Sequence, residues 1–431
     1  MKIFYRFCDF AQNDKQGEVY PARSRRTQND KKRNKMNIKQ KEAKYYMRVF
    51  KRNDLVVKKA KGQFIWDDKG KKYLDFFSGI SVCNLGHLNE AVVKAAKKQL
   101  DSYAHVSNLY YAAAQVDLAE ALSKKLDKTS GKTFLANSGA EANECAIKIA
   151  RKFGHTTGGR YEIISFNNSF HGRTVMTLAA TGQKKFHEFL HPLPEKFVFA
   201  EFNDIESVKK LINDKTVAVI IEPVQGEGGI FTADKNFLKE LRSLCDKKNL
   251  LLIFDEIQSG VGRTGKFFAF EHYGVKPDVA TLAKSLANGL PLGAAIAAGK
   301  ASEVFTYGDH GSTFGGNPVC CAAAYEVLKQ LTPSFLNKSL QTAKYLRKKL
   351  DALKKKYALI KEIRGMGLML GIDLSIAGGD IVSYCLNKGL IINCTHDTVL
   401  RLLPPLIITK KDVDSAIKIM EDAFKWAALK K

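Results

Sequence analysis

Two adjacent carboxylates end an apolar run in the stretch LLIFDEIQSGVGRTG, residues 251–265. Residues 251–254 have the composition of a buried strand, yet Asp255 and Glu256 follow with no basic residue beside them. An ionised carboxylate is costly to bury unless a cation or hydrogen-bond donors compensate its charge. The pattern therefore predicts that Asp255 faces a cationic group supplied from elsewhere, as in a binding site.

The glycines of the same stretch form the pattern G-x-G-x-x-G, which is the fingerprint of a dinucleotide-binding turn. That fingerprint requires the glycines to follow the strand directly and to open a helix. Here residues 255–259 intervene, and the following KFFAFEHYGVKPD has no sustained helical period. We therefore interpret Gly260, Gly262 and Gly265 as part of a flexible loop rather than as a dinucleotide site.

Lys284 is the only ionisable side chain between Asp278 and Lys300, and its neighbours are small or apolar. One interpretation is a surface lysine whose aliphatic stem lies along apolar atoms. The other is a desolvated amine with a depressed pKa, which is suited to forming a Schiff base with a carbonyl compound. The local sequence leaves both interpretations open.

An anion site is indicated by FLANSGAEANECAIKIARKF, residues 134–153. A strand ends here, Asn137, Ser138 and Gly139 make a turn, and a helix begins at once. The free N–H groups of such a helix attract an anion, and small residues such as Gly139 and Ala140 let the backbone approach a phosphate. The alternative is an ordinary serine cap followed by a glycine turn.

Together these three features match the contacts that pyridoxal phosphate needs. The helix N-terminus would hold the phosphate, and Lys284, 29 residues after Asp255, would bind the aldehyde. Asp255 would face the protonated pyridine nitrogen, which keeps the ring an electron sink. The cation missing beside Asp255 is thus expected on the cofactor.

The elements that position these residues alternate between strands and helices from about residue 130 to 300. Apolar runs predict seven strands, at residues 132–137, 161–166, 196–200, 217–221, 250–254, 279–282 and 294–298. Segments with helical spacing lie between them, such as EANECAIKIARKF and KNFLKELRSLCDKK. This alternation predicts an α/β fold with a mostly parallel seven-stranded sheet covered on both faces. Ligands of such sheets bind beyond the carboxyl ends of the strands, where Asp255 lies.

The chain is expected to fold in four parts. Residues 1–35 carry ten Lys or Arg against four Asp or Glu and lack the apolar core of a signal peptide, so we predict a disordered basic extension. Residues 36–95 form an N-terminal segment, with a hairpin turning at residues 68–71. Residues 96–314 form the large cofactor-binding domain. Residues 315–431 form a smaller α+β domain, with strands in 367–374 and 389–394.

Composition bounds the classes of function. The 431 residues are 45% hydrophobic, which is enough for a large core, and the formal net charge is +25. A basic surface attracts anionic small molecules, and it keeps a nucleic-acid-binding protein as the non-enzyme alternative. The charge is spread along the chain and no basic helix is interleaved with aromatic residues, which disfavours specific nucleic-acid recognition.

Cysteine and histidine usage predicts a cytoplasmic protein without a metal. The eight cysteines show no C-x-x-C spacing, which fits a reducing compartment better than a disulfide framework or a zinc site. The nine histidines contain no H-E-x-x-H pair. No apolar run approaches the ~20 residues of a membrane-spanning helix, so no membrane association is expected.

Eight stretches of the chain match the motifs of a known family. They are YLDFFSGISVCNLGH, NSGAEANECAIKIAR, FHGRT, EPVQGEGG, DEIQSGVGRTG, LAKSLANGLPLGA, HGSTFGGNP and LRLLPPLIIT. On these motifs the chain, from about residue 39 to 429, resembles the class III pyridoxal-phosphate aminotransferases. The resemblance implies a fold-type-I transferase that works as a homodimer with shared active sites and passes a terminal amine to 2-oxoglutarate. The expected donor is N-acetylornithine; ornithine and succinyl-diaminopimelate are the alternatives, because enzymes for these amines share most of the motifs.

The resemblance also implies roles for individual residues. Cofactor contacts are expected from Ser138, Gly139, Ala140, Phe170, Asp255, Glu256, Ile257, Gln258 and Lys284, and from Thr313 of the neighbouring subunit. Substrate contacts are expected from Arg173, Glu222, Ser312 and Arg401, with Glu222 opposite Arg401. Lys284 and Asp255 would be the catalytic residues, and no metal is implied. Without the family, Phe170 would be interpreted as a core residue and each arginine as a surface charge.

Overall fold

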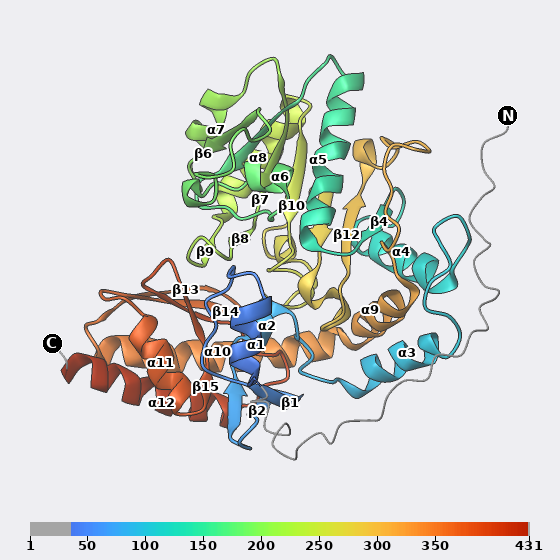
Figure 1. The fold of residues 1–431 in the computed structure, drawn as a ribbon. Coiled ribbons are helices and arrows are strands. Elements are labelled where there is room, and N and C mark those ends of the chain that lie inside the picture. The colour runs from blue at the N-terminus through green and yellow to red at the C-terminus, as the bar shows by residue number, and fades with distance from the viewer. Residues whose placement is uncertain (1–35, 430–431) are drawn as a thin grey trace, which may run out of the picture. The chain divides into compact units, whose positions relative to one another are not determined.

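The computed structural model describes residues 36–429, so the extension expected at residues 1–35 lies outside the described residues. The chain divides into two compact units, of which the first ends at Leu55 and the second begins at Val56. In the first unit, helix α1 (Ile38–Tyr45) begins with a reciprocal cap between Asn37 and Gln40. The second unit holds the other elements of the described chain (Figure 1). The domain boundaries expected at 95/96 and 314/315 stay predictions.

A seven-stranded sheet runs through the second unit (Figure 1). Its strands, in spatial order, are β4 (Lys132–Ala136), β12 (Gly293–Ala297), β11 (Val279–Leu282), β10 (Leu251–Asp255), β7 (Thr216–Ile221), β5 (Glu162–Phe166) and β6 (Phe197–Ala200). Neighbouring strands are parallel except that β12 runs antiparallel to β4 and β11. All seven predicted strands are confirmed, each within one residue of its expected bounds. The mostly parallel α/β sheet is likewise confirmed.

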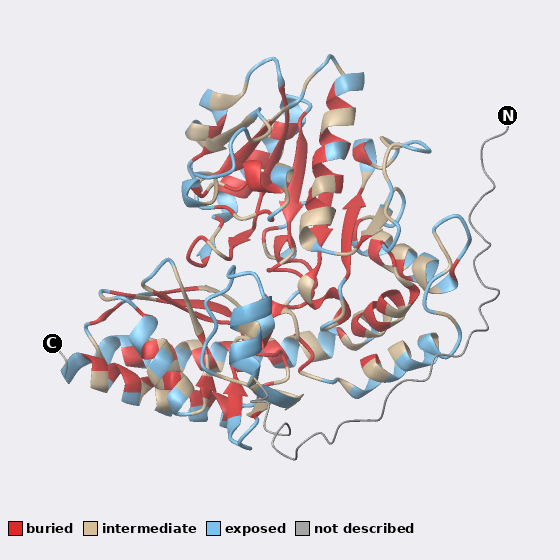
Figure 2. Cartoon of the chain, in the orientation of Figure 1, coloured by how far each residue is buried: buried red, intermediate tan, exposed pale blue. Residues whose placement is uncertain are grey.

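Helices cover both faces of this sheet. They are α4 (Ala113–Leu126), α5 (Gly139–Thr156), α6 (Val175–Ala179), α7 (Ile205–Leu211) and α8 (Lys235–Lys247). Successive residues of a strand point to opposite faces. Accordingly, Ile220 of β7 packs in one cluster with Ile149 of α5, whereas Ile221 packs in another with Leu241 of α8. The five inner strands are buried between these layers (Figure 2), which explains their continuously apolar sequences, whereas the edge strands β4 and β6 are mostly half-buried.

A second sheet joins the beginning and the end of this unit. It contains β1 (Val57–Lys61), β2 (Phe64–Asp67), β3 (Lys72–Asp75) and β15 (Leu390–Ile391). The expected hairpin is the antiparallel pair of β2 and β3. The structure adds a parallel pairing of β3 with β15, which places Leu74 beside Leu390.

The last part of the chain builds a four-stranded antiparallel sheet backed by helices, as the α+β pattern predicts. The strands, in spatial order, are β13 (Ile360–Met366), β14 (Met369–Leu374), β17 (Val399–Leu402) and β16 (Asn393–Thr395). The helices are α10 (Pro333–Lys356), α11 (Gly379–Asn387) and α12 (Lys410–Leu429). In Figure 1 these helices lie on the same side of that sheet.

The remaining elements connect these layers. They are α2 (Ser78–Ser81), α3 (Glu90–Leu100), α9 (Pro318–Gln330), β8 (Val224–Gln225), β9 (Phe231–Thr232) and the short 3₁₀ turns η2 (Lys184–Phe186), η3 (Ala269–His272), η4 (Lys284–Ala287) and η5 (Gly299–Ala301). Among the described residues, no helix is both long and apolar enough to cross a membrane.

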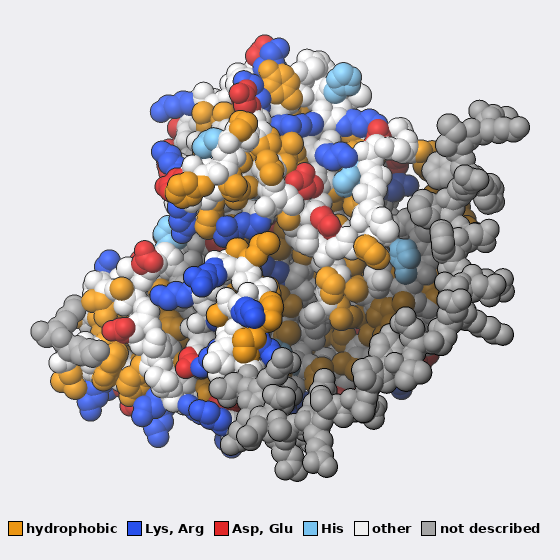
Figure 3. All heavy atoms as spheres, viewed as in Figure 1, with side chains coloured by type: hydrophobic (Ala, Val, Ile, Leu, Met, Phe, Trp, Pro, Cys, Tyr) orange, Lys and Arg blue, Asp and Glu red, His pale blue; other side chains and the backbone are white. Residues whose placement is uncertain are grey.

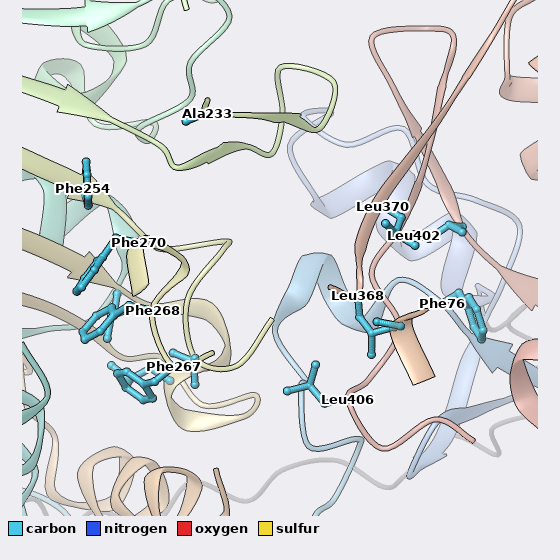
Figure 4. Packing of buried hydrophobic residues seen from close by; sticks show 14 of the residues in the cluster. Phe76, Ala233, Phe254, Phe267, Phe268, Phe270, Leu368, Leu370, Leu402 and Leu406 are labelled. Carbon is cyan, nitrogen blue, oxygen red and sulfur yellow. The ribbon is translucent and has the colours of Figure 1, made fainter. Parts of the chain in front are cut away.

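The largest core cluster extends from the seven-stranded sheet to the C-terminal sheet (Figure 4). On one side Phe268 and Phe270 stack at 4.6 Å between ring centroids, with Phe267 edge-on against Phe268. On the other side Leu368 and Leu370 pack from β14 and the turn before it. At the surface, Lys and Arg side chains are scattered over the face seen in Figure 3, with acidic side chains between them.

Candidate active site

A cavity of about 460 Å³ lies beyond the carboxyl ends of β4, β10 and β11, beside the start of α5. Of the residues predicted from the sequence, its wall contains Ser138, Gly139, Ala140, Phe170, Arg173, Glu222, Asp255, Ile257, Gln258 and Lys284. The other predicted residues, Glu256, Ser312, Thr313 and Arg401, do not line it. Residues far apart in the sequence therefore meet at the edge of the sheet where ligands of such folds bind.

Asp255 ends β10 and is 4% exposed. Its Oδ2 lies 2.8 Å from His171 Nδ1 and accepts a hydrogen bond of 2.7 Å from the Asn143 amide. The same amide donates to the His171 carbonyl, and Thr281 donates to the Asn143 carbonyl oxygen at 2.7 Å. Asp255 is thus held in one orientation by partners from α5 and from the segment after β5, and Thr281 of β11 in turn orients the Asn143 amide.

His171 and Asn143 were not predicted from the sequence. His171 lies within the FHGRT motif and Asn143 on the buried face of α5, but both contacts with Asp255 are long-range. A polar Asn among the apolar positions of that helix face was the available signal, because buried amides need partners.

Two polar atoms of this network have unused hydrogen-bonding capacity. Among the described residues, His171 Nε2 is buried without a hydrogen-bond partner. Within the described part of the chain, Asp255 Oδ1 accepts only the N–H of Ile257, at 3.0 Å, although a carboxylate oxygen has two lone pairs. Asp255 lines the cavity, so it can accept one more N–H from a bound group.

Lys284 follows β11 and begins η4 in a left-handed backbone conformation, with φ of +45°. A side chain other than glycine rarely adopts this region, and such strain concentrates at functional sites. Burial lowers the pKa of the Lys284 amine; the positive charge of Arg401 acts in the same direction and Glu227 opposes it. The structure therefore supports a desolvated amine on the cavity wall rather than a lysine on the surface.

The N-terminus of α5 opens onto the cavity. Ser138 is the N-cap, and its hydroxyl accepts the N–H of Glu141 at 3.2 Å. Gly139 follows, where a Cβ would lie only 2.9 Å from Ile257 Cδ1. The α5 helix has 18 residues and its first N–H groups face the cavity side, so this end attracts an anion.

Phe170 and Arg173 line the cavity on either side of a tight turn. The turn needs Gly172, because its φ is +143° and a Cβ there would meet Thr177 Oγ1 at 2.4 Å and Ala140 Cβ at 2.9 Å. Arg173 is exposed, and no carboxylate in the described part of the chain lies within ion-pair distance of it. It is therefore a cation available to a ligand.

The expected pairing of Glu222 with Arg401 is wrong. Arg401 is 2% exposed and forms its ion pair with Glu227, five residues further along the same motif. The Glu222 carboxylate instead accepts the backbone N–H groups of Phe170 at 3.0 Å and Gly226 at 3.1 Å. Glu222 directly follows β7, and its carboxylate accepts hydrogen bonds from these two N–H groups rather than from Arg401.

The pKa values of the two carboxylates are shifted in opposite directions. Burial raises the pKa of Glu222 to about 7, and the nearby Asp255 acts in the same direction. For Glu227, burial alone would raise the pKa, but Arg401 and Lys284 outweigh it and the pKa is lowered. Glu227 is thus the ionised partner of Arg401.

The expected cofactor contact of the Glu256 side chain is also not seen. This carboxylate is fully buried away from the cavity and accepts the N–H groups of Ala269 and Phe270, both at 2.8 Å, and the Ser259 hydroxyl at 2.9 Å. Glu256 directly follows β10 and its side chain turns inward, whereas Asp255, the last residue of the strand, faces the cavity. Burial raises the pKa of Glu256 to about 7.

Gln258 lies between the cavity and Arg401. Its amide donates to Glu227 at 3.3 Å, and its Oε1 accepts from Arg401 Nη1 at 3.3 Å. Arg401 Nη1 also donates to the Gly226 carbonyl, and its Nε donates to Asn393 at 3.1 Å. Arg401 Nη2 makes no hydrogen bond to any described residue, so half of the guanidinium fork is free.

Ser312 and Thr313 lie on the loop before α9. Ser312 Oγ accepts a hydrogen bond from Asn137, which lines the cavity, and Asn108 donates to the Ser312 carbonyl at 2.7 Å. Thr313 and Phe314 are exposed, Phe314 at 62%. Ser312 is therefore attached to the cavity edge, whereas Thr313 points to the surface of its own chain.

Comparison with known proteins shows the family of the chain. The chain matches the family described as Aminotransferase class-III over residues 46–424. It is 51% identical over 390 residues to the acetylornithine aminotransferase of Methanocaldococcus jannaschii, covering 89% of this chain and 96% of the relative. It is 45% identical over 379 residues to the protein of the same name from Aquifex aeolicus, covering 88% and 99%.

Solved structures show the same fold. The ornithine aminotransferase of Toxoplasma gondii superposes with a TM-score of 0.86 at 30% identity, covering 90% of this chain and 93% of that one. The N-acetylornithine aminotransferase of Stenotrophomonas maltophilia gives a TM-score of 0.77 at 34% identity, covering 90% and 99%. The chain thus belongs to the class-III aminotransferases, which are pyridoxal-phosphate-dependent enzymes of fold type I.

Proposed function

We propose that this aminotransferase transfers the terminal amino group of N-acetylornithine to 2-oxoglutarate, giving N-acetylglutamate 5-semialdehyde and glutamate. The names of the relatives support this donor. The observation that carries the proposal is a pair of arginines in opposite states: Arg173 has no carboxylate partner among residues 36–429, whereas Arg401 is paired with Glu227. One available arginine suits a donor with a single carboxylate far from its amine. Two available arginines suit 2-oxoglutarate, which has two carboxylates.

The residues of the cavity fit pyridoxal phosphate. The α5 N-terminus would hold the phosphate at Ser138, Gly139 and Ala140, and Asp255 Oδ1 keeps a lone pair for the ring N–H. Phe170 and Gln258 both line the cavity, so Phe170 would stack on the cofactor ring and Gln258 would bind the ring hydroxyl. Bound there, the cofactor would supply an electron sink for breaking the substrate C–H bond.

Lys284 and Asp255 would carry the proton chemistry. A lysine whose pKa is lowered by burial is neutral for a larger share of the time, so its Nζ can accept a proton from the substrate carbon and return it. Asp255, fixed by His171 and Asn143, would hold a proton on the ring nitrogen. Lys284 is also the amine that would bind the cofactor carbonyl.

Arg173 and Arg401 would sort the two substrates. While the donor is bound, Glu227 neutralises Arg401 and Arg173 holds the carboxylate far from the transferred amine. When 2-oxoglutarate enters, its α-carboxylate would displace Glu227 and use the free Nη2 of Arg401 for a bidentate contact. A permanently free Arg401 would instead favour donors that carry an α-carboxylate beside the amine.

The active enzyme is proposed to be a homodimer with shared sites. Leu109, Tyr110 and Tyr111 are exposed at 69% or more, and Asn108 ties their segment to the loop that carries Thr313 and Phe314. Exposed apolar clusters of this kind mark protein interfaces. A second copy covering it would bring Thr313 to the phosphate of the neighbouring site. The free cysteines of the described chain support a reducing, cytoplasmic setting.

A donor panel tests the proposal. The purified enzyme, loaded with pyridoxal phosphate, is given N-acetylornithine, ornithine or succinyl-diaminopimelate with 2-oxoglutarate, and glutamate formation is measured. N-acetylornithine is expected to have the highest kcat/KM. Ornithine is the second candidate, because the similar solved structures include ornithine aminotransferases. A higher kcat/KM for either alternative would replace the proposed donor.

A further inference from the structure

Phe186 lies against the Arg173 guanidinium, although no sequence motif singles it out. Arg173 Cζ is 4.0 Å from the centroid of the Phe186 ring and 5.6 Å from that of Phe170. The two rings are themselves 6.1 Å apart and nearly perpendicular, at 77°. The guanidinium therefore sits in a corner formed by two aromatic rings, with the closer contact to Phe186.

The segment that carries Phe186 is fastened on both sides. Phe186 ends η2, and its N–H donates to the Gln183 carbonyl at 3.0 Å. The Gln183 amide in turn donates to the Ser169 carbonyl at 3.1 Å, and His187 Nε2 lies 2.9 Å from the Leu178 carbonyl. The backbone that carries the Phe186 ring is therefore held in place before any ligand arrives, although several residues around it lie at the surface.

Such a contact would determine how Arg173 meets a carboxylate. An arginine side chain has several rotatable bonds, and holding it in one orientation costs entropy that a bound ligand must supply. Contact with an aromatic ring restricts the guanidinium while its N–H groups stay free to grip a carboxylate. Among the described residues no carboxylate performs this task, because Arg173 has no ion-pair partner there.

We propose that Phe186 is a positioning residue that presents Arg173 to the substrate carboxylate farthest from the transferred amine. The inference rests on the proposed function, since it takes Arg173 as the receptor of that carboxylate. It assigns Phe186 a role in substrate specificity: Phe186 would matter only for substrates that carry the distal carboxylate.

The test compares two donors that differ only in that group. N-acetylornithine has the carboxylate, and N-acetylputrescine is the same molecule without it. In single-turnover experiments with the cofactor-loaded enzyme, Phe186→Leu should weaken apparent binding of N-acetylornithine about two- to fivefold, the range of an exposed cation–π contact. The limiting rate should stay nearly constant, and N-acetylputrescine should bind as it does to the native enzyme.

Two further variants separate the role of the ring from general packing. Phe186→Trp should retain the binding of N-acetylornithine, because the aromatic face is kept. Phe186→Leu should have no additional effect in an Arg173→Leu background, because the two residues act through one contact. The affinity for glutarate, a dicarboxylate that cannot react, is measured by calorimetry. It should fall in Phe186→Leu and be retained in Phe186→Trp, which gives a readout independent of turnover.

The outcomes distinguish this inference from the proposed function. Equal weakening of both donors by Phe186→Leu, or equal behaviour of the Leu and Trp variants, would overturn the positioning role. If Arg173→Leu weakens N-acetylornithine but Phe186→Leu does not, the inference fails and the proposed function stands. If Arg173→Leu itself leaves N-acetylornithine binding unchanged, Arg173 is not the carboxylate receptor and that part of the proposed function fails.

Discussion

Glutamate should become a better amino donor when Glu227 is replaced by Gln. Arg401 is almost fully buried and paired with Glu227, so the α-carboxylate of glutamate must displace Glu227 before it can bind Arg401. Glu227→Gln keeps the size of the side chain and one acceptor oxygen but removes the negative charge. Arg401 retains its hydrogen bonds to the Gly226 carbonyl and Asn393, so the guanidinium stays oriented.

The size of the effect follows from the contact that is lost. A hydrogen bond to a charged group is worth about 1.5–3 kcal/mol, which corresponds to roughly ten- to a hundredfold in affinity. Glu227 keeps 26% of its side chain exposed, and solvent weakens the pair. We therefore expect the preference for glutamate over N-acetylornithine to rise by about ten- to thirtyfold, in the lower part of that range.

Rapid mixing measures each half-reaction separately. The cofactor-loaded enzyme is mixed with glutamate or N-acetylornithine alone, and the change in visible absorbance gives a rate and an apparent affinity for each donor. Glu222→Gln is the matched control, because it removes a carboxylate from the same motif that does not touch Arg401. Melting temperatures show whether each variant is folded. A shift in donor preference with Glu222→Gln but not with Glu227→Gln would refute the reasoning.

Three other predictions follow from the site. Lys284→Ala should keep bound cofactor through the phosphate and ring contacts yet lose at least about 10²–10⁴-fold in transamination rate, as measured by glutamate formation; near-native turnover would exclude Lys284 as the catalytic amine. Mixing inactive Lys284→Ala and Thr313→Ala subunits should restore activity, because one site of the heterodimer receives both lesions and the other none; no recovery despite subunit exchange shown by mass spectrometry would argue against shared sites. The free energy of unfolding should fall as pH rises from about 4.5 to 7, because Glu256 has a pKa of about 7 when folded and 4.5 when unfolded, so the unfolded chain loses its proton first. Urea titrations at pH 5 and pH 8 should show this loss, and Glu256→Gln should reduce it; an unchanged pH dependence in that variant would assign the effect to another group.

The parts of the fold that the sequence predicted depend on local patterns. The inner strands of the large sheet are continuous apolar runs because helices bury both of their faces, so their positions could be read without knowing their neighbours. Lys284 stood out because it is the only charge in an apolar segment, and the start of α5 because a turn and a helix meet there. Each signal lies within a few residues of the feature it predicts.

The parts that were missed depend on contacts between distant segments or on the direction of one side chain. Glu222 and Glu227 stand in one motif, and only the path of β8 and Gly226 decides which of them reaches Arg401. His171 and Asn143 meet Asp255 across the fold. For Glu256 the direction of the side chain decided: it directly follows β10 and turns inward to the N–H groups of Ala269 and Phe270.

The parallel pairing of β3 with β15 has a consequence during synthesis of the protein. Leu74 and Asp75 find their partners Leu390 and Ile391 only when nearly the whole chain has left the ribosome. At about 5–20 residues per second this delay is on the order of tens of seconds. Until then the hairpin of β2 and β3 presents an unpaired strand edge, which invites association with other nascent chains. A chain that stops before residue 390 lacks both the partner of this edge and Arg401, so truncated products would be substrates for chaperones and proteases rather than partly active enzymes.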